Sequence, residues 1–182
     1  YQLSTDQVEP NVEVDPDNRF FWRANMMQRL DIEALRDTIL AVTGNLDRSL
    51  GGPAGRLTDD FKRRTLYALI SRNKIDPSLE LFDFPNPNNT TEHRSVTVGP
   101  LQRLYFMNSS FIAAQSKALA KRLDKEASSD KARIVLAYRL LYGRKPEPSE
   151  IQLGLNYLRQ THDGWSRYTQ ALLSSSEFST VN

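Results

Sequence analysis

The residues of this chain best suited to bind a ligand are two arginines, one aspartate, one glutamine and one asparagine from its middle third. They are Arg64, Asp83, Arg94, Gln102 and Asn108. Asp83 stands between two phenylalanines in a proline-rich stretch, and a partly buried carboxylate needs a cationic partner. Arg63, Arg64 or Arg94 is the expected partner. Two interpretations stay open: a structural ion pair that fixes the stretch, which we favour, and a polar pocket for a small or polymeric ligand.

The two histidines, His93 and His162, do not predict a metal site, because neither has a second histidine at metal-ligand spacing. Arg94 follows His93 directly and also disfavours a bound cation. No Gly-x-Ser-x-Gly elbow supports a serine nucleophile, and the pair Asp59 and Asp60 is interpreted as a helix cap. We therefore expect neither catalytic nor metal-binding residues in this chain.

The composition is that of a globular domain without cysteine: 182 residues, 39% hydrophobic and 25% charged. The absence of cysteine excludes disulfides, iron–sulfur clusters and covalent c-type haem attachment in this segment, and we expect no cofactor here. No apolar run approaches the roughly 20 residues that cross a bilayer, which predicts no membrane span. No helix-turn-helix or RNA-binding signature is present, so nucleic acid is not an expected partner.

Charge is unevenly distributed along the chain. Residues 1–18 contain five acidic residues and no Lys or Arg, for a charge of −5. Residues 101–145 contain ten Lys or Arg against three Asp or Glu, for a charge of +7. The two segments could attract each other or face a partner, although solvated helix faces are the simpler explanation.

Hydrophobic periodicity and capping residues predict a mainly α, multi-helix, bundle-like domain. The expected helices are Arg19–Leu30 with an aromatic anchor at Phe20, Phe21 and Trp22, Ile32–Thr43, one from Pro100 to a break at Asn108–Ser110, Phe111–Leu123, one between Asp130 and Gly143, one from Pro148, and Trp165–Ser174. Residues 1–18 are expected to be an acidic extended arm. Residues 19–182 form the predicted domain, with a subdivision into 19–99 and 100–182 as an option.

A minimal two-stranded β element is the other expected feature. Ser95–Val98 is short, alternating and β-branched, which is typical of a strand. Lys62–Ser71 is compatible with helix or strand, and its part Thr65–Ile70 is the expected pairing partner. Between them, Asp76–Thr91 is rich in proline and asparagine and is predicted to be a long irregular loop.

Several short motifs occur in a fixed order along the chain. They are Asp15-Pro16-Asp17-Asn18-Arg19 with Trp22-Arg23, Arg29-Leu30-Asp31 with Ala34-Leu35-Arg36-Asp37, Gly51-Gly52-Pro53, Arg63-Arg64, Phe82-Asp83-Phe84-Pro85, Pro100-Leu101-Gln102 and Met107-Asn108. In this order they resemble the C-terminal domain of the large exported proteins of planctomycetes and related bacteria that carry planctomycete-type cytochrome c domains. This family is labelled domain of unknown function 1553.

The resemblance implies export to the periplasm or the cell surface. It also implies neighbouring domains in a parent chain: a helical companion domain, often a c-type cytochrome, and sometimes a carbohydrate-binding-like sandwich. The family has no established catalytic residues to carry over to this sequence.

Three functional hypotheses follow. We favour a non-enzymatic structural and interaction module that packs on the companion domain and takes part in polysaccharide handling. The first alternative is part of a glycan-active hydrolase with its site near Asp83 and Arg94. The second is a docking domain for a c-type cytochrome, with contact through the basic face Lys117–Lys145.

Overall fold

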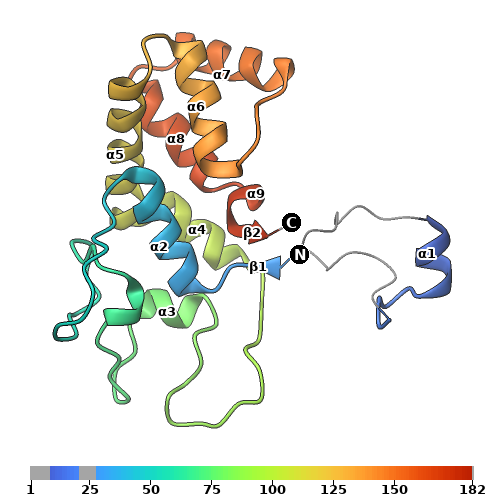
Figure 1. Cartoon of the computed structure of the whole chain (residues 1–182), viewed down its shortest axis with the longest axis vertical. Helices are drawn as coiled ribbons and strands as arrows, with labels where there is room; N and C mark the ends of the chain where they lie inside the picture. The colour runs from blue at the N-terminus through green and yellow to red at the C-terminus, as the bar shows by residue number, and fades with distance from the viewer. Residues whose placement is uncertain (1–8, 21–27, 182) are drawn as a thin grey trace.

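A computed structural model describes residues 9–20 and 28–181, and it confirms the mainly α, bundle-like fold class (Figure 1). The elements are α1 (Glu9–Val14), β1 (Gln28–Arg29), α2 (Ile32–Thr43), the 3-10 helix η1 (Thr65–Tyr67), α3 (Pro77–Leu81), α4 (Pro100–Asn108), α5 (Ser110–Glu126), α6 (Asp130–Tyr142), α7 (Pro148–Gln160), α8 (Gly164–Leu173), α9 (Ser176–Ser179) and β2 (Thr180–Val181). None of the helices in these two ranges is both long and apolar enough to cross a membrane.

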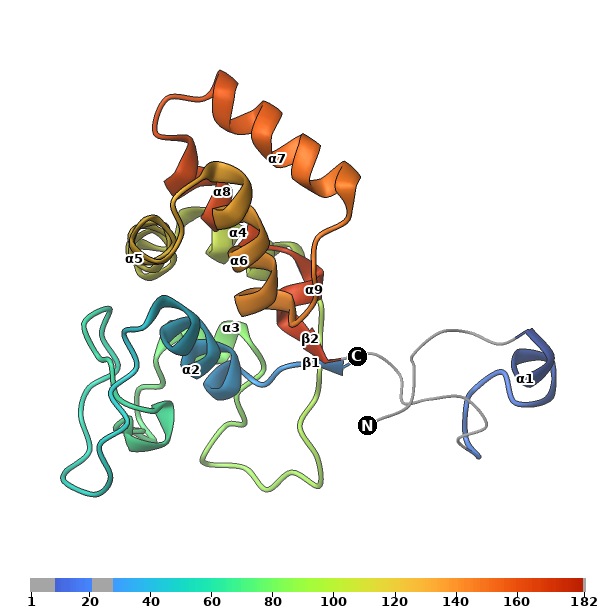
Figure 2. The same ribbon diagram turned by 45° about the horizontal axis from the view of Figure 1, so that its top comes forward.

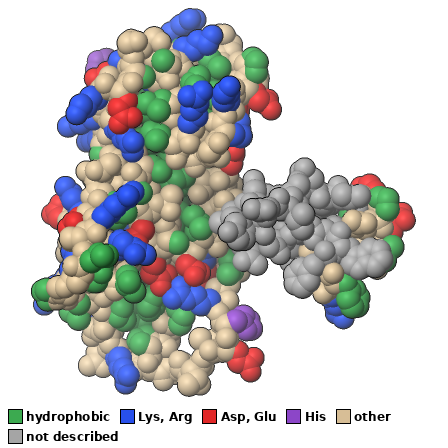
Figure 3. Space-filling model, in the orientation of Figure 1, with side chains coloured by type: hydrophobic (Ala, Val, Ile, Leu, Met, Phe, Trp, Pro, Cys, Tyr) green, Lys and Arg blue, Asp and Glu red, His purple; other side chains and the backbone are tan. Residues whose placement is uncertain are grey.

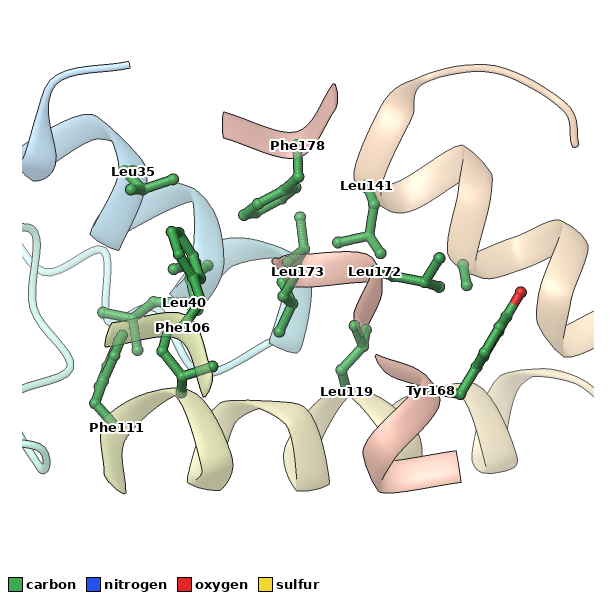
Figure 4. Packing of buried hydrophobic residues seen from close by; sticks show 14 of the residues in the cluster. Leu35, Leu40, Phe106, Phe111, Leu119, Leu141, Tyr168, Leu172, Leu173 and Phe178 are labelled. Atoms are coloured by element: carbon green, nitrogen blue, oxygen red, sulfur yellow. The ribbon is translucent and has the colours of Figure 1, made fainter. Parts of the chain in front are cut away.

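The core lies between α5 and α8, with α2 on one side and α6 and α7 on the other (Figure 2). Leu119 of α5 and Leu173 of α8 are fully buried, and Leu40 of α2 and Phe106 of α4 pack into the same cluster (Figure 4). Burial of each such side chain contributes about 1.5–3 kcal/mol to folding. The helices around α4 and α5 therefore form a rigid base for the loops that surround them.

Local capping signals explain why several predicted helix boundaries are confirmed. Helix α2 covers the predicted range, and it ends because Gly44 adopts the left-handed conformation, with φ of 77°. Gly143 ends α6 in the same way, with φ of 71°. Pro100 and Pro148 occupy the first turns of α4 and α7, where their missing N–H costs nothing.

The predicted strand pairing is wrong. Thr65–Tyr67 is a 3-10 helix, and Thr65 is held by Asp37, whose Oδ1 accepts both its N–H and its hydroxyl at 2.7 Å. The strand pair is instead β1 with β2, antiparallel, with Gln28 opposite Val181. The backbone of the Ser95–Val98 segment is bound by side chains rather than by a neighbouring strand, as described below.

The first predicted helix, Arg19–Leu30, is also wrong at both described ends. Asn18 has φ of 51° and does not cap a helix, and Arg19 lies in a turn whose N–H donates to Asp15 Oδ1 at 2.8 Å. At the other end, Gln28 belongs to β1. Phe20 is 74% exposed and is not an anchor, whereas residues 21–27, with Phe21 and Trp22, lie outside the described residues.

Short helices interrupt two segments that were predicted to be irregular. Helix α1 lies within the expected extended arm, and α3 lies within the expected loop Asp76–Thr91. Helix α3 begins there because Asp76 accepts the N–H of Ser78 at 2.9 Å and Pro77 follows it. Asp59 does not cap a helix; its carboxylate accepts a hydrogen bond from the Ser110 hydroxyl at the start of α5.

Candidate functional site

Asp83 is bound by Arg29, and not by any of the three arginines expected to be its partner. Arg29 Nη2 lies 2.7 Å from Asp83 Oδ2, and the two side chains are only 7% and 16% exposed. The guanidinium also lies over the Phe82 ring, 5.3 Å from its centroid. Arg29 is therefore the partner that sequence reasoning missed, although it opens one of the motifs that carry the family resemblance.

Thr97 completes this ion pair from the loop that precedes α4. Its N–H donates to Asp83 Oδ2 and its hydroxyl to Asp83 Oδ1, both at 2.8 Å. Arg29 Nε donates to the Thr97 carbonyl at 3.2 Å. Gln102 of α4 donates to the Leu81 carbonyl at 3.0 Å and closes the arrangement. We call Arg29, Asp83, Thr97 and Gln102 the latch, because they join β1, the end of α3 and the start of α4.

The other predicted binding residues are not bonded to the latch. Arg94 forms two hydrogen bonds with Glu33, at 2.8 and 2.7 Å, and an ion pair with Asp31 at 3.3 Å. Arg64 lies 3.8 Å from Asp37. Asn108 is exposed at the last position of α4. The structure therefore brings Asp83 and Gln102 together through Thr97, but it does not place all five residues in one pocket.

A groove of about 650 Å³ runs beside α4 and contains two of the predicted residues, Arg94 and Gln102. Its apolar lining includes Phe82 and Phe106, and Arg103 joins Arg94 as a second basic side chain not bound in the latch. The remaining lining residues are Arg29, Val96, Val98, Gly99, Ser174, Ser176, Ser179 and Thr180. We call this hollow the α4 groove. Its described lining contains no Asp or Glu, but Arg29 and Arg94 are paired with Asp83 and Glu33, so Arg103 is the lining cation without an ion pair to a described residue.

Two smaller hollows contain the remaining predicted charges. Arg64 and Arg94 line a hollow of about 420 Å³ with Phe84. Asp83 and Arg94, the two residues of the predicted site, line another of about 310 Å³ in the proline-rich loop together with His93. Among the described residues, no three His, Cys, Asp or Glu side chains converge as a metal site would require.

The basic segment from residue 101 to 145 is partly neutralised. Arg122 pairs with Glu126 at 2.9 Å, and Arg144 holds Glu150 and Glu177 at 2.8 and 2.6 Å. On the face seen in Figure 3, Lys and Arg side chains are spread over the α5–α7 end of the molecule with Asp and Glu among them. Four basic side chains, with Glu126 among them, line a hollow of about 660 Å³ between α2 and α5: Arg48, Lys121, Arg122 and Lys125.

The Arg94–Glu33 pair predicts part of the acid sensitivity of the fold. Burial is the largest influence and acts to raise the pKa of Glu33, but the hydrogen bonds from Arg94, a backbone hydrogen bond and the charge of Arg94 together hold the pKa below the ordinary value of 4.5. A lowered folded-state pKa contributes stability that is present above pH 4.5 and is lost as the pH falls through the folded value.

We therefore expect Arg94→Gln to lose less stability than the wild type between neutral pH and about pH 3. Urea unfolding at a series of pH values measures this difference. Arg103→Gln is the matched control, because Arg103 makes no ion pair with any described residue, and its profile should follow the wild type. Parallel profiles for Arg94→Gln and the wild type would contradict the assignment.

A comparison with protein families matches residues 1–158 to PSD1, described as a protein of unknown function (DUF1553). No curated protein and no solved structure matches the chain. The match ends inside α7, so the helix α8, which packs against α5 in the core, lies beyond it. Since the match covers most of the 182 residues, the chain belongs to the PSD1 (DUF1553) family, whose function is unknown.

Proposed function

We propose that this protein is a non-enzymatic interaction module that docks on a companion domain through an apolar surface along α4. Five large apolar side chains, each between 46% and 73% exposed, carry the proposal. They are Val96, Val98, Leu101, Leu104 and Met107. We call them the α4 face. They lie close together in the chain, on α4 and just before it, and a contiguous exposed apolar patch is typical of a protein interaction site.

Three of these side chains lie on one side of α4, and Val96 and Val98 belong to the segment just before it. Leu101, Leu104 and Met107 follow each other at intervals of three residues, so they project from neighbouring positions around α4. Gln102 and Phe106 on the same helix are buried. Helix α4 therefore has one side in the core and a second apolar side in contact with solvent, which favours a partner on that second side.

The bonding of Asp83 supports a structural rather than a catalytic part for the latch. Both carboxylate oxygens are occupied, Oδ2 by Arg29 and the Thr97 N–H, and Oδ1 by the Thr97 hydroxyl. A general acid or nucleophile must reach the substrate with a free oxygen. The latch would instead hold the loop before α4 in the position that presents the α4 face.

The proposed partner is the helical companion domain that the family resemblance implies, in the periplasm or at the cell surface. Polysaccharide handling would then belong to the assembled protein rather than to this domain alone. Docking of a c-type cytochrome would use the basic side chains between Lys117 and Lys145, and such binding would weaken steeply with salt.

Isothermal titration of this chain with the separately expressed companion domain tests the proposal. We expect Leu101→Glu to weaken binding by at least about tenfold, as central apolar contacts of interfaces do. Leu153→Glu on α7 is the matched control, because Leu153 is similarly exposed at 73% but lies outside the α4 face. Binding that resists Leu101→Glu would refute the proposal, and binding lost only at high salt would favour the cytochrome-type contact.

A further inference from the structure

The segment Ser95–Val98 belongs to no strand of the structure, but its sequence has the pattern of one. It leads from the proline-rich loop into α4 (Figure 1), and its residues alternate between hydroxyl and valine side chains. In a strand, the backbone groups of successive residues point to opposite edges. The two edges of this segment therefore have to be considered separately.

One edge is occupied by the latch. The Thr97 N–H donates to Asp83 Oδ2 at 2.8 Å, and the Thr97 carbonyl accepts from Arg29 Nε at 3.2 Å. Asp83 and Arg29 thus offer an acceptor and a donor, as the backbone of a neighbouring strand would. This satisfies the inner edge without any strand pairing.

The opposite edge is open. The backbone N–H and carbonyl groups of Val96 and Val98 have no hydrogen-bond partner among the described residues. An exposed row of such groups is a template for pairing with another extended chain. Since the β-branched alternation of Ser95–Val98 favours a strand, the segment is suited to accept one.

The lining of the α4 groove, which includes Val96 and Val98, indicates what kind of polypeptide could bind at this edge. Val96 and Val98 line the groove together with Phe82 and Phe106, which makes part of its lining apolar. Arg103 also lines it and makes no ion pair with any described residue, so it is available to a carboxylate. A partly apolar lining with a free guanidinium favours a ligand with both apolar and acidic groups.

We propose that the open edge of Ser95–Val98 binds an extended segment of a partner polypeptide by β-strand addition, with an apolar side chain in the α4 groove and an acidic side chain at Arg103. The inference rests on the proposed docking function and specifies how the partner would bind. Main-chain hydrogen bonds would supply affinity, and the groove would supply selectivity. A second copy of this chain fits less well, because a symmetric edge-to-edge contact would bring the same arginines together.

Selection of short random peptides on the immobilised wild-type protein, followed by fluorescence anisotropy with the most enriched peptide, tests this mode. We expect enriched peptides to alternate apolar residues with Asp or Glu. Val96→Pro removes a backbone donor and should weaken binding by about tenfold or more, whereas Val96→Thr keeps the donor and the branched shape and should bind within about twofold. Arg103→Glu should weaken binding similarly, and Arg139→Glu on α6 is the exposed control.

A backbone-methylated form of the peptide provides a test that leaves the protein unchanged. Methylation at the alternate amides that would pair should abolish binding, and methylation at the intervening amides should not.

The proposal is overturned if no peptide is enriched, or if binding of the enriched peptides is unchanged by Val96→Pro and Arg103→Glu. A mass increase in sedimentation that Val96→Pro reverses would identify a second copy as the occupant and would also overturn it. If Leu101→Glu abolishes binding of the companion domain but Val96→Pro does not, strand addition is refuted. The proposed docking function would still hold in that case.

Discussion

Replacing Asp83 with alanine is expected to lower the free energy of unfolding by about 3 kcal/mol, because it leaves the nearly buried guanidinium of Arg29 without its anion. The Thr97 N–H and hydroxyl lose their acceptor in the same change. Asp83 also has φ of 63°, a left-handed conformation that aspartate and asparagine tolerate better than alanine. All three effects destabilise the folded state. We therefore expect the latch to contribute much of the stability of the loops that it joins.

Thermal melting measures this change, and for a chain of this size it corresponds to a decrease of about 10 °C in Tm. Asp83→Asn is the matched control: it keeps the size, the left-handed tolerance and one acceptor oxygen but removes the charge and the second acceptor, so its loss should be smaller. A variant Asp83→Ala that melts like the wild type, yet no longer binds the companion domain, would instead assign Asp83 to a ligand site. An unchanged Tm with unchanged binding would contradict both roles.

Phe111→Ala should cost about 4 kcal/mol of unfolding free energy, which is the usual loss when a large ring is removed from a core. Phe111 is 2% exposed in the first turn of α5. Its ring also lies 3.9 Å from the guanidinium of Arg36, which is itself buried. Arg36 Nη2 donates to the carbonyls of Thr58 and Phe61, at 2.7 and 3.0 Å, so the ring supports a cation that holds a loop.

Urea unfolding with Phe111→Leu as the control separates the two contributions. Leucine fills most of the cavity but cannot give the cation–π contact, and the loss should be less than about half of that for alanine. Limited proteolysis at residues 47–63 should accelerate in Phe111→Ala before global unfolding does, because Arg36 loses its support. Equal losses for alanine and leucine would mean that the ring contributes through Arg36 rather than through core packing.

The parts of the fold that could be predicted are those with local causes. Helices α2, α4, α6 and α7 begin or end at Gly44, Pro100, Gly143 and Pro148, and each of these residues acts on its own backbone. Periodic apolar residues then point each helix toward the core. Such signals lie within a few residues of their effect, and they can be seen in the chain alone.

The parts that could not be predicted depend on contacts between distant residues. Arg29 and Asp83 are separated by 54 positions. The three arginines that were expected to pair with Asp83 are closer to it in the sequence, but none of them binds it. The alternation of Ser95–Val98 indicates a strand preference but does not say what satisfies its edges. Here the side chains of Arg29 and Asp83 bind the Thr97 backbone, and Thr65 of the expected strand partner is bound by Asp37 instead.

The pairing of β1 with β2 has a mechanical consequence. Gln28 lies opposite Val181. Tension applied through the residues before Gln28 and after Val181 would therefore separate the two strands from that end, one residue pair after another. Hydrogen bonds loaded one after another yield at lower force than bonds loaded together. The next pair in line contains Arg29, which also holds Asp83 and Thr97. Stretching the chain would therefore reach the latch almost at once, and the loop before α4 would be released while the core between α5 and α8 was still intact.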